Sequence, residues 1–465
     1  MQPTYLYELV QSFSKREQRE AQKWLASPYH NQRADLPALF EYLLKTAQPP
    51  SKAAIWQALF PDTPYNDQQL RLLQSYLYRS LEDFLLHQEL GNRPESTQHL
   101  LLDAYRKRGL DRHFTKAYRQ QQRALEQTPL QHPEHHLALY WQERALFQQQ
   151  ARRERTREHN LQAMEDALTL AFLSMKLRQA CWLLAHEAVY KAEYKVALEP
   201  LLLELALKPA YAQQPAVAIY LNCYRMLKAP EQSAHFEAFR HWLFRIIGHF
   251  PVEELRDLFL LGINYCIRQI NRTADSYLRE ALELYKKGLE TDLLLENGVL
   301  SRFTYNNIAG ISLRLQELDW TAHFLETYRP MLAPHERQAA YSLNAARLAF
   351  SRKDYAQSIT HLQQADYKDF INNLVARTLL LKCYYELDEY DLLEYHLQTM
   401  RSFLRRKRKM SYHQQNYRNI VQLTFRLIRL NPGNQEAIQQ LKTAIETTTP
   451  LTERSWLLNA LNRHR

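Results

Sequence analysis

The sequence predicts an all-α fold from three observations: scarce glycine, apolar residues at helical spacing and a recurring segment. Only 8 of the 465 residues are glycine, whereas globular proteins carry about 7%. Strand-rich folds and doubly wound sheets use glycine in turns, bulges and phosphate loops, so those classes are excluded. A hydrophobic share of 46% excludes a disordered chain. Apolar residues spaced three and four apart along most of the chain indicate amphipathic helices.

Residues 1–92 are the first expected part, a helical N-terminal cap domain. Ser14 followed by Glu17 predicts a capping box at a helix start, because each side chain satisfies a free backbone amide of the first turn. The segment around 13–26 is similar to the opening helix of a helix-turn-helix regulator. Pro37, however, falls where the recognition helix would need regular backbone, so we expect a cap and not a DNA-reading domain.

Residues 93–430 are expected to form a helical-repeat array. An acidic-aromatic pair recurs at 35-residue intervals, each time after one apolar helix and at the start of another. The three pairs are Asp319-Trp320, Asp354-Tyr355 and Glu389-Tyr390. A further copy is expected over 176–210, with Tyr194 at its turn. One helical hairpin cannot bury its own apolar face, so such hairpins stack on one another.

These segments resemble tetratricopeptide repeats, whose period is about 34 residues. The resemblance covers 176–210 and 337–401, and it implies a right-handed superhelical α-solenoid of antiparallel helix hairpins. Helices within 431–465 are expected to cap its apolar end. The whole chain also resembles large uncharacterised bacterial helical-repeat proteins that open with a short helical domain carrying a Ser-Pro-Tyr turn, here residues 27–29. That second resemblance implies no activity.

A solenoid of hairpins presents its first helices along a concave face that suits an extended peptide or a partner helix. Aligning the repeats places Asn344, Arg347 and Lys382 on that face, and Trp182 and His186 on the equivalent face upstream. The first three resemble part of the clamp with which some tetratricopeptide domains hold a peptide carboxylate. The resemblance implies a groove for an acidic or extended protein segment. A polar, solvated face is the alternative.

The net charge is +10, a mild excess for this length. Its densest part is a run of five consecutive cations, namely Arg405, Arg406, Lys407, Arg408 and Lys409. Such a run near a helix C-terminus offsets the helix dipole and can simply be solvated. It also suits contact with nucleic acid or with an acidic protein segment, because clustered cations displace counterions from phosphates. Both interpretations stay open.

No motif indicates catalysis. The two closest glycines are ten residues apart, which excludes phosphate loops and dinucleotide fingerprints. His132 and His136 are weak metal candidates that we expect at a solvated helix start. We therefore expect no enzyme activity, no cofactor and no metal.

Four widely spaced cysteines indicate reduced, buried thiols, and no signal peptide or membrane-length apolar run is visible. The sequence therefore predicts a cytoplasmic protein without membrane insertion. We expect a non-catalytic protein-interaction scaffold or adaptor that binds a partner segment. The alternative is a regulator or accessory factor that contacts nucleic acid through residues 405–409.

Overall fold

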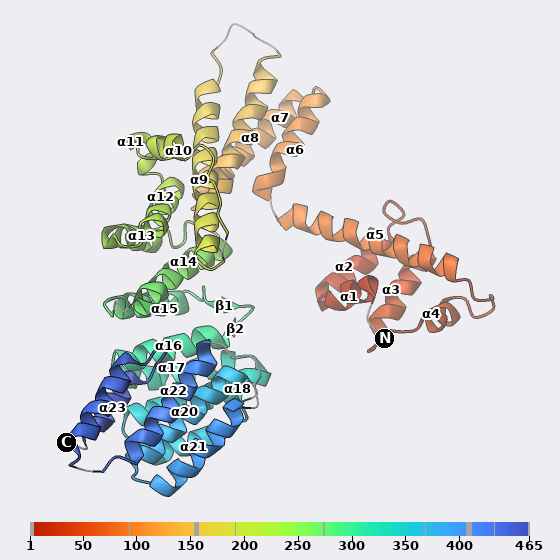
Figure 1. The fold of residues 1–465 in the computed structure, drawn as a ribbon. Coiled ribbons are helices and arrows are strands. Elements are labelled where there is room, and N and C mark those ends of the chain that lie inside the picture. The colour runs from red at the N-terminus through yellow and green to blue at the C-terminus, as the bar shows by residue number, and fades with distance from the viewer. Residues whose placement is uncertain are drawn as a thin grey trace. The chain divides into compact units, whose positions relative to one another are not determined.

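The computed structural model describes residues 4–92, 94–152, 158–190, 192–272, 275–367, 369–405, 412–431 and 433–463. Over these residues it contains twenty-four α-helices, one 3-10 turn and one hairpin of two short strands, so the all-α prediction is confirmed (Figure 1). None of the helices in these ranges combines the length and apolar character that a membrane span requires.

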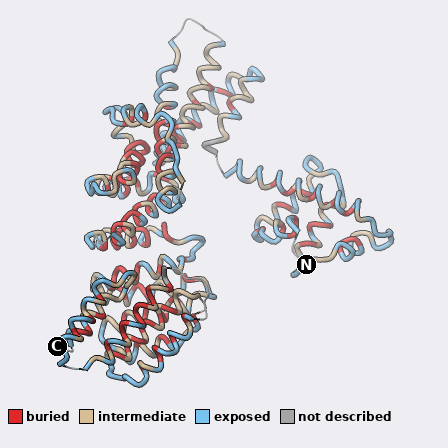
Figure 2. Tube along the Cα trace, in the orientation of Figure 1, coloured by how far each residue is buried: buried red, intermediate tan, exposed pale blue. Residues whose placement is uncertain are grey.

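The chain folds as two compact units. The first comprises residues 1–176 and 204–217, and the second comprises 177–203 and 218–465. In each unit the buried residues lie where helices face one another (Figure 2). The three-part division expected from the sequence stays a prediction.

The first five helices of unit one enclose a core of their own. They are α1 (Tyr5–Ser12), α2 (Lys15–Ala26), α3 (Asp35–Lys45), α4 (Lys52–Leu59) and α5 (Asp67–Asn92). Phe40 and Trp56 are among the buried side chains of this core. The capping box predicted at Ser14 is present: its side chain accepts from the Glu17 amide, and Glu17 accepts from the Ser14 amide.

Three further helices of unit one pack against one another, namely α6 (Pro94–Lys107), α7 (Asp111–Gln127) and α8 (Pro133–Gln150). The histidines at the start of α8 are not solvated, contrary to expectation: His132, His135 and His136 are 6–8% exposed. Burial lowers the pKa of His136 to about 4, because a charged imidazole is poorly solvated there. The described part of the chain holds no group of three metal-ligating side chains.

Helix α9 (Leu161–Glu187) begins in unit one and ends in unit two, and α10 (Glu199–Ala206), α11 (Pro209–Ala212) and α12 (Pro215–Lys228) follow. The repeat expected at 176–210 is only partly formed. Its second helix was expected to begin near Tyr194, but that residue is not helical and α10 begins at Glu199. Leu198, directly before α10, has a positive φ of 62°, a conformation in which a helix cannot continue.

Unit two continues with α13 (Ser233–Arg245), α14 (Val252–Asn271) and α15 (Tyr277–Glu290). A short antiparallel hairpin follows, formed by β1 (Leu295–Glu296) and β2 (Val299–Leu300). Its turn residues Asn297 and Gly298 both have positive φ. An Asn-Gly pair is a strong hairpin signal because a tight hairpin turn needs two such residues.

The rest of unit two is a succession of packed helices. They are α16 (Arg302–Arg314), α17 (Leu318–Tyr328), α18 (Pro334–Ser351), α19 (Tyr355–Gln363), α20 (Phe370–Glu386), α21 (Tyr390–Arg405), α22 (Tyr412–Ile428), α23 (Gln435–Thr447) and α24 (Arg454–Asn462), with a 3-10 turn at Arg329–Met331. Consecutive helices are in contact from α14 to α22, and the even-numbered helices from α16 to α24 also contact one another in sequence.

Three helix turns share one backbone conformation. Gln316, Lys353 and Asp388 have φ values of 59°, 63° and 59°, and each directly precedes an acidic residue and the next helix. At each turn the amide of the acidic residue bonds the carbonyl five residues earlier, which satisfies a free end of the preceding helix. The first two of these turns are 37 residues apart and the last two are 35 residues apart. The predicted 35-residue period therefore holds only between Lys353 and Asp388. In the first copy, Leu318 takes the place expected for Trp320.

Candidate anion-binding groove

The face expected to bind a peptide is filled by the protein itself. Asn344 on α18 is fully buried, and its amide donates to Asn306 at 2.6 Å and to the Ala340 carbonyl at 2.9 Å. Arg347 donates to the Asn344 side chain at 3.1 Å, and burial lowers the pKa of its guanidinium. These two residues are brought together as expected, but they bond each other and the interior.

Helix α24 covers the third clamp residue, Lys382 on α20. The Lys382 ammonium lies 2.9 Å from Glu453, with side-chain exposures of 15% and 27%. It also lies over the ring of Phe350, 4.7 Å from the centroid. Nearby, the Trp456 indole donates to Glu386 at 3.0 Å and its ring meets Tyr385 edge-on. The C-terminal helix and the residue before it thus take the place expected for a partner at Lys382.

The two upstream candidates, Trp182 and His186, lie on α9. They are far from Lys382 in the sequence and are not enclosed as Lys382 is. Trp182 is 49% exposed and lies under the Arg178 guanidinium, 5.3 Å from the ring. His186 is exposed, and its Nδ1 is 3.0 Å from the Tyr194 hydroxyl. These two residues form surface contacts, and their neighbours Leu183, Glu187 and Tyr194 line a small hollow of about 320 Å³.

Of the basic run, Arg405 is placed and Arg406, Lys407, Arg408 and Lys409 lie outside the described residues. Arg405 is the last residue of α21, and it lines a groove of about 790 Å³ between α21 and α22. The ten residues that line this arginine groove are Gln398, Arg401, Leu404, Arg405, Arg418, Val421, Gln422, Phe425, Arg426 and Arg429.

Helical periodicity places these side chains on facing sides of the two helices. Gln398, Arg401 and Arg405 are three and four residues apart on α21 and share one face. Arg418, Gln422 and Phe425 recur at the same spacing on α22, and Arg429 continues this spacing in the turn that directly follows the helix. The opposite face of α22 supplies buried Ile420, Leu423 and Leu427 to the core, which fixes the rotation of the helix.

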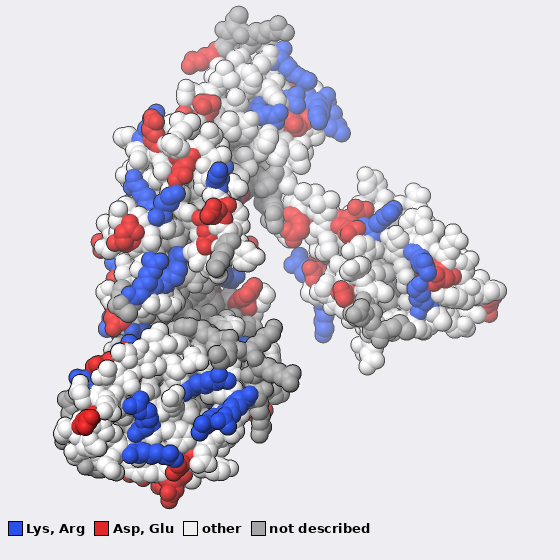
Figure 3. Space-filling view, viewed as in Figure 1, with Lys and Arg blue, Asp and Glu red and all other residues white. Residues whose placement is uncertain are grey.

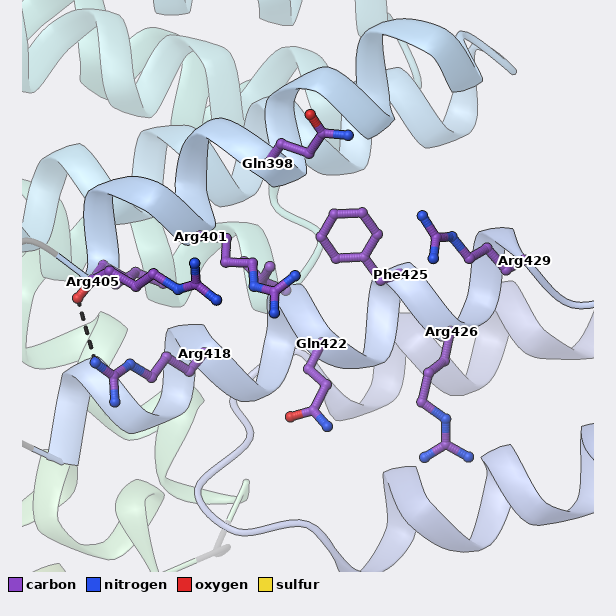
Figure 4. Close-up of a pocket in the computed structure, with 10 residues that line it drawn as sticks. Gln398, Arg401, Arg405, Arg418, Gln422, Phe425, Arg426 and Arg429 are labelled. Atoms are coloured by element: carbon purple, nitrogen blue, oxygen red, sulfur yellow. Dashed lines mark hydrogen bonds between the residues drawn. The ribbon is translucent and has the colours of Figure 1, made fainter.

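Figure 4 shows which of these side chains project into the groove. Arg401, Arg405 and Phe425 project into the space between α21 and α22, and Arg426 points away from α21. A smaller adjoining hollow of about 300 Å³ shares Phe425, Arg426 and Arg429 and adds α23 residues such as Gln440. The arginines therefore border a continuous depression across α21, α22 and α23.

The groove carries positive charge without compensation from its own lining. Five of its ten lining residues are arginines, and none of the ten is acidic. Within the described residues, Arg401, Arg405 and Arg426 form no ion pair, and all three are exposed. Arg429 pairs with Glu394 at 2.7 Å on the surface, and Arg418 lies 3.5 Å from the Leu404 carbonyl (Figure 4). Figure 3 shows Lys and Arg side chains gathered over this part of unit two, with few acidic neighbours.

Sequence reasoning found only Arg405 of the groove. Arg401, Arg418, Arg426 and Arg429 are single arginines, so no local run marks them. A signal was present, because Arg418 falls on the polar stripe of the amphipathic helix α22. That this stripe faces α21 depends on how the two helices pack.

Unit one carries a second basic surface, on α7. Arg112, Lys116, Arg119 and Arg123 are spaced by three or four residues and line a shallow, open hollow with Thr115, Gln120 and Asp111. This surface contains an acidic residue and no aromatic ring. It therefore has fewer of the features that identify a ligand than the arginine groove has.

A comparison of the chain with protein-family models, with curated proteins and with solved structures finds no match.

Proposed function

We propose that this protein is a non-catalytic binding protein that holds an anionic segment of a macromolecule in the arginine groove. One observation carries the proposal: five arginines line a groove whose lining contains no carboxylate. Like charges along one groove repel one another, so an anion that enters the groove relieves that repulsion.

The lining chemistry favours binding over reaction. The groove residues are arginine, glutamine, leucine, valine and phenylalanine. None of these is a usual nucleophile or a general acid or base at neutral pH. The groove is open along α22, which suits a chain better than a small metabolite enclosed on all sides.

The repeated helix turns and the packing of neighbouring helices support a tetratricopeptide-like solenoid as the framework. In this proposal α14 to α22 form the array, and the first helix α18 contacts both α16 and α20. The four cysteines are buried and unpaired, which supports a reducing compartment such as the cytoplasm. The scaffold role expected from the sequence is kept, but its binding surface moves from Lys382 to the arginine groove.

The test is binding of two labelled polyanions, a poly-glutamate peptide and an oligonucleotide, measured by fluorescence anisotropy at low salt. We expect the wild-type chain to bind at least one of them and the double variant R401Q/R426Q to bind it at least tenfold more weakly. Neither residue has an ion pair with a described residue, so the variant should fold normally.

The matched control is R314Q/R352Q, which removes the same charge from exposed pairs with Asp275 and Asp319 outside the groove. We expect this control to bind as the wild type does. The proposal is wrong if neither polyanion binds, or if the two double variants bind equally well.

A further inference from the structure

We infer that the anion held by the arginine groove is single-stranded nucleic acid. The inference rests on the proposed function and adds the class of ligand. Three features of the groove suit a nucleic-acid strand: the type of cation, the length of the cationic row and an aromatic ring within it. The ring is the feature that favours a single strand over an acidic polypeptide and over a duplex.

All five cations that line the groove are arginines. A guanidinium offers several N–H donors in a planar fork that matches two oxygens of a phosphate, whereas lysine acts as a point charge. A carboxylate presents the same two oxygens, so the arginines in this lining favour an oxyanion ligand, whether phosphate or carboxylate.

The row is long enough for several phosphates. Arg418 lies on α22 and Arg429 directly follows the helix, eleven residues later, which corresponds to roughly 16 Å at the helical rise. Phosphates of one strand are about 3.4 Å apart along the axis of a duplex and more widely spaced in an unstacked strand, so that length accommodates fewer than five phosphates. Arg401 and Arg405 border the same length from α21, so a backbone that follows the groove is contacted from both sides.

Phe425 distinguishes a single strand from the other polyanions. Its ring is half-buried and lies between the arginines, with the Arg429 guanidinium 5.5 Å from its centroid (Figure 4). A base that is free of pairing stacks on such a ring. Bases in a duplex are already stacked and paired, and acidic peptides have no base. Gln398 and Gln422, both exposed lining residues, add amide donors and acceptors to the groove.

The experiment compares three labelled probes by anisotropy: a twenty-residue oligothymidine, a duplex of the same length and a poly-glutamate peptide of similar charge. We expect the single strand to bind tightest. The slope of log affinity against log salt should fall by about 1.4 units in R401Q/R426Q, since each lost phosphate contact on a single strand contributes about 0.7.

Two Phe425 variants test the stacking. F425L keeps an apolar side chain for the core and should weaken oligothymidine binding about fivefold or more, with an unchanged salt slope. F425W keeps a ring, and its fluorescence should be quenched when oligothymidine binds. Circular dichroism checks that both variants are folded, and the quenching of F425W reports on the site even if F425L is destabilised.

The outcomes separate the two proposals. Tighter binding of the duplex or of poly-glutamate, or an F425W signal unmoved by bound oligothymidine, overturns the single-strand inference and leaves the anion-binding function in place. If none of the three probes binds, both the anion-binding function and the single-strand inference are wrong.

Discussion

Two cationic faces of unit two differ in what surrounds them. On α20, Lys382 faces Glu453, directly before α24, at 2.9 Å and two aromatic rings. Arg401 on α21 and Arg426 on α22 are exposed and form no ion pair with a described residue. Both faces place cations on helices that also contribute to the core. Helical pattern alone therefore does not identify a binding site; a site also requires that no other part of the chain supplies the counter-charge.

The largest effect on stability should come from removing a side chain of α24 that covers the face of α20 around Lys382. Trp456→Ala deletes a ring that packs on Tyr385 and an indole that donates to Glu386. We expect the free energy of unfolding to fall by about 3 kcal/mol, measured by urea denaturation. Trp182→Ala is the control, because Trp182 is half-exposed and should cost less than about 1 kcal/mol. Equal losses would show that α24 does not cover Lys382 in solution.

Removing one cation from each face tests the comparison directly. Lys382→Gln leaves the partly buried Glu453 without its ion pair and should cost about 2 kcal/mol of unfolding free energy. Arg426→Gln removes an exposed cation and should change it by less than about 0.5 kcal/mol. In oligothymidine binding the order should reverse, with only Arg426→Gln weakening the complex. The same order in both measurements would contradict the distinction between the two faces.

A gain of affinity should follow from Glu394→Gln. The Glu394 carboxylate lies 2.7 Å from the Arg429 guanidinium at the edge of the groove. In the proposed complex it competes with a phosphate for this guanidinium. Removing this carboxylate should tighten oligothymidine binding about threefold at low salt, because exposed ion pairs contribute less than about 1 kcal/mol. Asp319→Asn is the control, since it releases Arg352 outside the groove. Unchanged affinity in Glu394→Gln would remove Arg429 from the site.

The smallest effect on stability is expected at the helix turns with positive φ. Lys353 lies between α18 and α19 and has a φ of 63°, which is unfavourable for residues with a Cβ. Lys353→Gly should raise the unfolding free energy by about 0.5 kcal/mol, the relief of strain being partly offset by added flexibility. Asp388→Gly should gain less, because Asp388 also accepts from the Tyr390 hydroxyl at 3.0 Å. A loss of stability in Lys353→Gly would argue against this turn conformation.

The local parts of the fold could be predicted from the sequence. Ser14 and Glu17 interact within one helical turn, and the starts of α19 at Tyr355 and α21 at Tyr390 follow an acidic residue that ends a turn. Short-range hydrogen bonds and backbone conformation decide such features. The repeat at 176–210 was predicted too regular, because nothing local marks the positive φ of Leu198.

The candidate site was largely beyond prediction. Arg405 stood out as part of a run, but Arg418 and Arg429 become significant only when α22 packs beside α21. From the sequence, Asn344 was expected on the concave face because its position in the first helix of the repeat is one that faces that side. Its burial depends on Asn306, which is 38 residues away in the sequence.

The sequence by itself determined the helical fold, several caps and turns, and the cationic character of the chain, because each depends on residues within a few positions of one another. The tertiary structure decided which cations are neutralised and which are free. That outcome depends on partners such as Lys382 and Glu453, 71 residues apart. Electrostatic energy depends on the distance between charges in space and on their exposure to water, and neither follows from the order of residues along the chain.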